Sequence, residues 1–285
     1  MNAKLLVLVP AVVLAATLLS PGCSSNSAEP VVKKVDHITI STNQAQELFT
    51  IFNDTLGLPV AWPFSAYPGF STGGVQAGNV NLETMGMGDP VAGEEGAASL
   101  YGIVLEPYPI DQVMDPLRAR GADPSDPQVQ MREINGQQVP FWTNVTLNTL
   151  CTPAYIVYLC EYSNAAKSAL QAIEVSGPLG GLGLVSVSEI RIGSKDAGAL
   201  RQKWSDAFAP SSMSAEGLMP IGEGPAVAVA SSDQDAIQSL VFEVASLKQA
   251  REFLQAQGML GDSSDNELRI DPTKIQGLDI RVIQR

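Results

Sequence analysis

Val35-Asp-His-Ile-Thr-Ile40, a helical stretch, and then Gly78-Asn-Val-Asn-Leu-Glu83 together decide the fold of this chain. The first segment holds the only histidine of the sequence, His37. Successive side chains of a strand point to opposite faces, so each segment presents one apolar face and one polar face. We expect the apolar faces to pack against the helix. The polar faces, with His37 and Glu83, should then lie together on the other side of the sheet.

The helix between the two strands is predicted from Asn43 to Leu56 and ends at Gly57. Its apolar residues recur at helical spacing, which is typical of a helix with one buried face. That stripe consists of Ala45, Leu48, Phe49, Phe52 and Leu56. In the preceding strand Ile38 and Ile40 should contact it, while Thr39 shares the opposite face with the histidine.

The strand–helix–strand–strand–strand unit recurs three more times, within residues 100–162, 185–230 and 239–283. One unit buries only the helix side of its sheet, so two units are expected to pair around a shared cleft. Such concave surfaces favour ligand sites. We therefore predict an α+β fold of two domains, each made of paired βαβββ modules that form a curved mixed sheet around a cleft.

Composition limits the possible partners. The chain has 285 residues, 45% of them hydrophobic and 16% charged, and a net charge of -13. This composition is globular. Phosphate binding requires clustered Lys and Arg, so nucleic acid is excluded as an expected partner.

The N-terminus has the pattern of a targeting segment. Lys4 is followed by an apolar run from Leu5 to Leu19 and by Ser20-Pro-Gly-Cys23. Glycine directly before Cys23 resembles a bacterial lipoprotein signal, in which that cysteine becomes the lipidated first residue. The resemblance implies an exported protein, lipid-anchored to a membrane of the cell envelope on its periplasmic or extracellular face. The alternative is an ordinary secretory signal with an incidental cysteine.

These features divide the chain into five parts. We expect a signal peptide at 1–22, a flexible tether at 23–32, a first domain at 33–163, a linker at 164–183 and a degenerate second domain at 184–285. Two further cysteines, Cys151 and Cys160, lie in the first domain, and the sequence leaves open whether they form a disulfide.

The motifs resemble the vicinal oxygen chelate (VOC) superfamily, which contains glyoxalases, bleomycin-resistance proteins and extradiol dioxygenases. The resemblance rests on Val35–Ile40, on Phe52-Asn-Asp-Thr-Leu-Gly-Leu-Pro-Val60 and on Gly73-Gly-Val-Gln-Ala-Gly-Asn-Val-Asn-Leu-Glu83. It implies two glyoxalase-like domains. Carried over by position, His37 and Glu83 stand where two ligands of one divalent metal (Mn, Fe, Ni or Zn) would be. Glu161 completes a triad only if local register turns it inward.

In the second domain, Glu189 stands in the place of His37 and Val229 in that of Glu83. We therefore expect no metal there. Extradiol ring cleavage as the resemblance describes it requires two histidines, whereas this chain contains one.

Three functions remain open, and no catalytic residue is assigned. The first is a membrane-tethered protein that binds a small organic ligand in the first cleft through Thr39, Asn81, Trp62 and Phe70. The second is a divalent-metal-dependent lyase, isomerase or dioxygenase centred on His37 and Glu83. The third is a structural or partner-binding lipoprotein.

Overall fold

The structure is a computed structural model that describes residues 28–87, 96–134, 136–169 and 177–284. The expected signal peptide and Cys23 lie outside the described residues. Among the described residues, no helix is both long and apolar enough to cross a membrane.

The first half of the chain contains two modules of similar element order. The first module comprises β1 (Val32–Thr42), α1 (Ala45–Thr50), the π-helical turn η1 (Ile51–Thr55), β2 (Val60–Tyr67), β3 (Phe70–Gln76) and β4 (Asn81–Met87). The second comprises β5 (Ala98–Pro107), α2 (Ile110–Ala119), β6 (Gln128–Ile134), β7 (Gln137–Thr146), the 3-10 turn η2 (Asn148–Leu150) and β8 (Ile156–Tyr162), and α3 (Asn164–Ala169) follows.

The second half repeats the pattern with shorter outer strands. Its third module comprises β9 (Leu184–Ser194), α4 (Ala197–Ala207), β10 (Leu218–Met219) and β11 (Ala226–Ser231). Its fourth comprises β12 (Ala236–Val244), α5 (Leu247–Ala256), β13 (Leu260–Ser263), β14 (Glu267–Ile270), the 3-10 turn η3 (Pro272–Lys274) and β15 (Ile280–Ile283).

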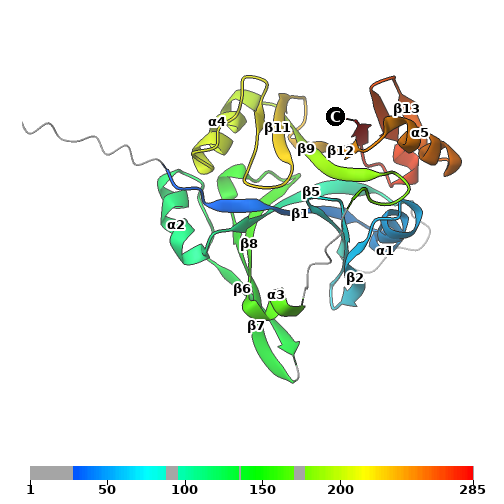
Figure 1. Cartoon of the computed structure of the whole chain (residues 1–285). Coiled ribbons are helices and arrows are strands. Elements are labelled where there is room, and N and C mark those ends of the chain that lie inside the picture. The colour runs from blue at the N-terminus through cyan, green and yellow to red at the C-terminus, as the bar shows by residue number, and fades with distance from the viewer. Residues whose placement is uncertain (1–27, 88–95, 135, 170–176, 285) are drawn as a thin grey trace, which may run out of the picture.

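Each half forms one mixed sheet (Figure 1). The order of the eight-stranded sheet is β2-β3-β4-β1-β5-β8-β7-β6, and that of the seven-stranded sheet is β10-β11-β9-β12-β15-β14-β13. The opening strands of paired modules run antiparallel, β1 beside β5 and β9 beside β12. Each opening strand also pairs in parallel with the last strand of its own module, as β1 does with β4. The predicted α+β fold with internally duplicated, curved mixed sheets is confirmed.

The helix-facing side of the first sheet forms the expected core. Ile38, Ile40, Leu48, Phe52 and Leu56 are all fully buried. The predicted helix covers the right residues, although it changes from α-helical to π-helical geometry at Ile51.

The two sheets are joined by close contacts in the chain segment that enters β4. Asn79 exchanges two hydrogen bonds with the backbone of Val187, one of 3.0 Å to its carbonyl and one of 2.9 Å from its amide. A Cβ at Gly78 would lie 2.2 Å from the carbonyl oxygen of Val185, and the residue has φ of +79°. Only glycine therefore fits this contact.

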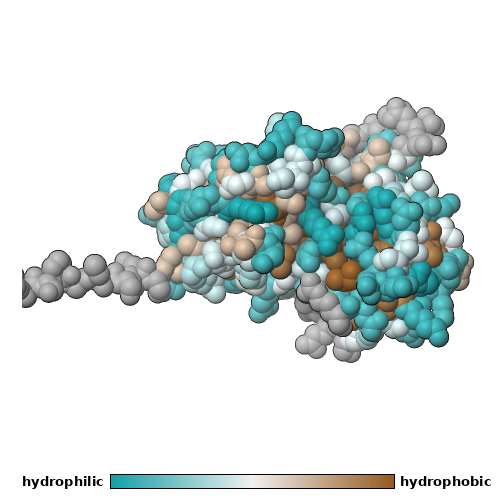
Figure 2. All heavy atoms as spheres, turned by 90° about the horizontal axis from the view of Figure 1, so that it is seen from above, coloured by the Kyte–Doolittle hydropathy of each residue, from teal (hydrophilic) through white to brown (hydrophobic). Residues whose placement is uncertain are grey.

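Residues at the expected tether and linker also belong to the packed fold. Val31 and Val32 are buried, and so are Leu179 and Leu182. All four are part of a core cluster that runs through both sheets. On the face seen from above, hydrophilic residues cover most of the surface, in keeping with the acidic composition (Figure 2).

Candidate functional site

A cavity of about 1050 Å³ lies against the eight-stranded sheet, on the face opposite α1. All eight strands contribute to its lining. Of the residues predicted from sequence, five line it: His37, Trp62, Phe70, Asn81 and Glu83. The alternation of β1 and β4 therefore places the histidine and the carboxylate together as expected.

A buried chain of polar contacts surrounds His37. Its Nδ1 lies 2.7 Å from Oδ2 of Asp36, and its Nε2 lies 3.4 Å from Oε2 of Glu83. Glu83 also accepts hydrogen bonds from the hydroxyls of Thr39 (3.0 Å) and Thr72 (2.7 Å). Each carboxylate oxygen of Glu83 is thus satisfied within the protein.

Asp36 is a site residue that the sequence reasoning missed. Neighbouring strand residues normally face opposite ways, yet Asp36 and His37 both line the cavity. The pairing of β1 with β5 is irregular between Val35 and His37, and a bulge of this kind turns an extra residue toward one face. Asp36 also accepts a 2.8 Å hydrogen bond from the hydroxyl of Tyr162.

The electrostatics favour an imidazolium between two carboxylates. Burial alone lowers the pKa of His37, but the hydrogen bonds and charges of Asp36 and Glu83 outweigh burial and raise that pKa to about 9. Burial raises the pKa of both carboxyl groups, and their contacts with His37 outweigh this effect, so each pKa lies below its usual value.

Aromatic rings form much of the cavity wall. Trp62 and Tyr158 meet the ring of His37 edge-on, with ring centroids 5.8 Å and 6.4 Å away. Trp62 can lie there because it crosses Gly74, where a Cβ would come within 2.4 Å of the indole ring. The sequence analysis did not use Gly74 for this purpose, although a glycine in the strand that faces Trp62 is a signal of such close packing.

Two predicted site residues have other positions. Thr39 is not part of the cavity lining and has 1% of its surface exposed. Its hydroxyl instead donates a hydrogen bond to Glu83. Glu161 is also absent from the lining, to which β8 contributes Tyr158, Cys160 and Tyr162. Strand alternation groups Glu161 with the core residue Leu159, so the inward register it required does not occur.

The two cysteines of the first half do not form a disulfide with each other. Cys151 and Cys160 are both free thiols. The Cys151 thiol donates to the carbonyl oxygen of Leu147 at 3.3 Å. Burial, reinforced by the charge of Asp36, raises the pKa of Cys160 well above its usual value. A thiol with such a pKa is a poor nucleophile.

The donor set does not fit a resident metal ion. Across the described residues, no group of three or more His, Cys, Asp and Glu side chains is arranged to hold one. His37 and Glu83 supply two donors, and a catalytic metal site needs at least a third.

The corresponding place in the second sheet is different. In the first sheet, Glu83 of β4 pairs with Thr39 of β1, and Thr39 comes two residues after His37. In the second sheet, Arg191 comes two residues after Glu189, and its partner on β11 is Ala228. Ala228 therefore takes the place that Glu83 has in the first sheet. The expectation for Val229 was therefore wrong by one residue, and Val229 instead faces the core.

Solved structures with this architecture are found at low sequence identity. A mutant of 4-hydroxymandelate synthase from Streptomyces coelicolor is 12% identical, with 90% of this chain and 93% of that chain covered and a TM-score of 0.58. A hypothetical protein from Staphylococcus aureus is 12% identical, with coverage of 88% and 99% and a TM-score of 0.59. The chain has the fold of the vicinal oxygen chelate proteins.

Another structure with this VOC fold is homoprotocatechuate 2,3-dioxygenase from Arthrobacter globiformis. It is 11% identical, with coverage of 91% of this chain and 82% of that chain and a TM-score of 0.54. No family model matches the sequence, and no curated protein matches it significantly. At such identities the likeness establishes the fold alone.

Proposed function

We propose that the chain binds a small organic molecule with an apolar ring-bearing body in the cavity of the eight-stranded sheet. The observation that carries this proposal is the cavity of about 1050 Å³, with aromatic walls and a buried Asp36–His37–Glu83 chain. Ligand pockets in proteins combine such apolar walls with a few placed polar groups. The cavity volume also leaves room for a molecule of drug size.

A fluorescent probe tests this proposal directly. N-phenyl-1-naphthylamine is neutral, aromatic and emissive only in apolar surroundings. We expect it to bind the purified protein at one molecule per chain and to quench the emission of Trp62 and Trp142, which both line the cavity. Asn81→Trp fills the cavity beside the probe and should weaken binding at least about tenfold, the effect of about 1.4 kcal/mol.

Asn266→Trp is the matched control, because Asn266 is exposed in the turn between β13 and β14. It should leave the affinity unchanged. Absence of saturable binding, or equal affinity in both variants, would refute binding in this cavity. Urea unfolding of both variants checks that they are folded.

A divalent-metal-dependent lyase, isomerase or dioxygenase is the second candidate. It is favoured by the dioxygenase among the structures with this fold and by the pairing of His37 with Asp36 and Glu83. Metal-ligating histidines usually donate their other ring N–H to a carboxylate, a backbone carbonyl or water, and Asp36 is such a partner for Nδ1 of His37. The incomplete donor set argues against it.

Metal analysis separates the two candidates. After incubation with Mn, Fe, Ni or Zn, the enzyme hypothesis predicts near-stoichiometric metal that is lost in His37→Ala and Glu83→Gln. Background metal in the wild-type protein would reject the hypothesis. A structural or partner-binding role requires that neither probe nor metal binds.

We also propose that Cys23 carries a lipid that tethers this binding domain to a membrane of the cell envelope. The support is the Ser20-Pro-Gly-Cys23 sequence after an apolar run. Cys23→Ser should move the protein from the membrane fraction to the soluble fraction. Unchanged fractionation would contradict the anchor.

A further inference from the structure

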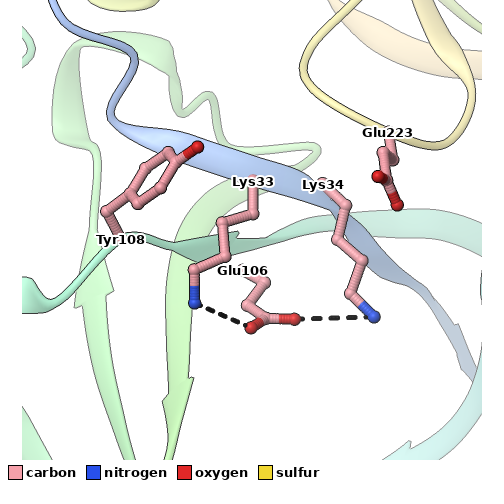
Figure 3. Close-up of a pocket in the computed structure, with 5 residues that line it drawn as sticks. All are labelled: Lys33, Lys34, Glu106, Tyr108 and Glu223. Atoms are coloured by element: carbon pink, nitrogen blue, oxygen red, sulfur yellow. Dashed lines mark hydrogen bonds and ion pairs between the residues drawn. The ribbon is translucent and has the colours of Figure 1, made fainter.

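The acidic side chains of the cavity are neutralised within the protein. Asp36 contacts His37 and Lys34, and Glu83 contacts His37. Glu106 lies between two lysines, 3.1 Å from Nζ of Lys33 and 3.5 Å from Nζ of Lys34 (Figure 3). A ligand therefore meets carboxylates whose charge is already balanced by neighbouring cations.

The guanidinium group of Arg132 has a different environment. Its central carbon lies over three aromatic rings, 4.9 Å from the centroids of Tyr67 and Trp142 and 5.3 Å from that of Phe141. Its Nη1 donates a 2.9 Å hydrogen bond to the hydroxyl of Tyr67. Among the described residues, no carboxylate lies within ion-pair distance of Arg132, although the chain as a whole is strongly acidic.

Arg132 is also held in a fixed place. It comes from β6, one edge of the sheet, and Tyr67 comes from β2, the opposite edge. The side chain thus spans the cavity, which it helps to line. Aromatic faces stack on guanidinium groups and pre-organise them, so the unused N–H donors need little further ordering to bind an anion.

Two other groups in the cavity lining fit an anionic, polar-substituted ligand. Lys167 of α3 lines the same cavity and likewise has no acidic partner among the described residues. Asn144 contributes a buried Oδ1 that accepts no hydrogen bond in the described part of the chain. A buried unpaired acceptor is costly and is stabilised by a donor such as a hydroxyl or N–H group of a ligand.

We propose that the molecule bound in this cavity is an aromatic anion, whose carboxylate or sulfonate group binds Arg132 while its ring lies against the aromatic walls. This inference rests on the proposed binding function. Arg–carboxylate pairs are frequently bidentate and are stronger than neutral hydrogen bonds, so Arg132 sets the sign of the charge that the site accepts. Lys167 adds a second positive charge to the cavity lining.

Two probes with the same ring system provide the test. 8-Anilino-1-naphthalenesulfonate differs from N-phenyl-1-naphthylamine by one sulfonate group. The wild-type protein should bind the sulfonate at least about tenfold more tightly, as expected for one charge-assisted contact. Arg132→Gln should remove this preference, because it should weaken binding of the sulfonate at least about tenfold more than binding of the neutral probe, whereas Arg132→Lys should keep most of the preference.

Arg118→Gln is the matched control, because Arg118 is an exposed arginine of α2 paired with Asp115. It should change neither affinity. If both probes bind equally to the wild-type protein, or if Arg132→Gln weakens both equally, the anion preference is refuted while the binding function stands. If neither probe binds, the binding function itself fails.

Discussion

The β1–β4 pair and the β9–β11 pair share one topology and differ in what they bury. In the first sheet, Asp36, His37 and Glu83 form a buried charged chain against a cavity. In the second sheet, Glu189 has an ordinary ion pair with Arg191 at 3.0 Å, and 39% of the arginine side chain is exposed. The helix side of each sheet forms a buried core in both halves and stabilises the shared fold. Residues on the opposite face of the sheet can therefore differ between the two halves. A binding site belongs to that face and is not a consequence of the fold.

The largest difference between the two pairs should appear when a carboxylate is removed. Asp36→Ala removes one of the two carboxylates that flank the buried His37, and also the acceptor of the Tyr162 hydroxyl. It should destabilise the protein by about 3–5 kcal/mol, the cost of breaking a buried ion pair. Glu189→Ala should cost less than Asp36→Ala, because 39% of the Arg191 side chain and 16% of the Glu189 side chain are exposed and water screens the pair. Urea unfolding measures both, and equal losses would show that the two faces are not energetically distinct.

This asymmetry was only partly predictable from the sequence. Alternation in β1 and β4 gives the faces of His37 and Glu83, and helical spacing gives the apolar stripe, because both patterns are local. Asp36 could not be found in this way, since its orientation depends on a bulge set by pairing with the distant strand β5.

Other parts of the site depend on contacts between remote segments. Arg132 and Tyr67 are 65 residues apart in sequence and meet because the two sheet edges approach each other. The position of Glu161 depended on the register of β8, which the sequence left open. Ala228 rather than Val229 takes the place of Glu83 because the β9–β11 register decides that position.

A pH titration tests the same difference between the two halves, because the second half contains no histidine. The pKa of His37 rises from 6.5 to about 9 on folding, so its contribution is complete below pH 6.5 and is lost as the pH rises through 9. The shift corresponds to about 3 kcal/mol of unfolding free energy. We expect the stability difference between wild type and His37→Gln to fall by this order between pH 6.5 and 9. A difference that is independent of pH would contradict the buried imidazolium.

The joint between the two halves is tested by Gly78→Ala. The new methyl group would overlap the carbonyl oxygen of Val185 at a positive φ, so we expect a loss of about 2–3 kcal/mol. Gly121→Ala is the control, because Gly121 has φ of +72° but open space around it, and should cost about 1 kcal/mol. Thermal and urea unfolding measure both variants. Equal effects would show that the contact between the sheets is not tight.

The smallest effect is expected at Glu161, and it decides whether this carboxylate joins His37 and Glu83 as a third metal ligand in the first cleft. Glu161 shares its strand face with the core residue Leu159, while the adjacent Cys160 lines the cavity. Glu161→Gln should therefore leave metal content unchanged and the affinity for N-phenyl-1-naphthylamine within about twofold, less than 0.5 kcal/mol. Cys160→Phe, one residue away, should fill the cavity and weaken probe binding at least about tenfold. If Glu161→Gln abolished metal or probe binding, the carboxylate would have to reach the cavity, and the first cleft would then hold the triad that the second cleft lacks.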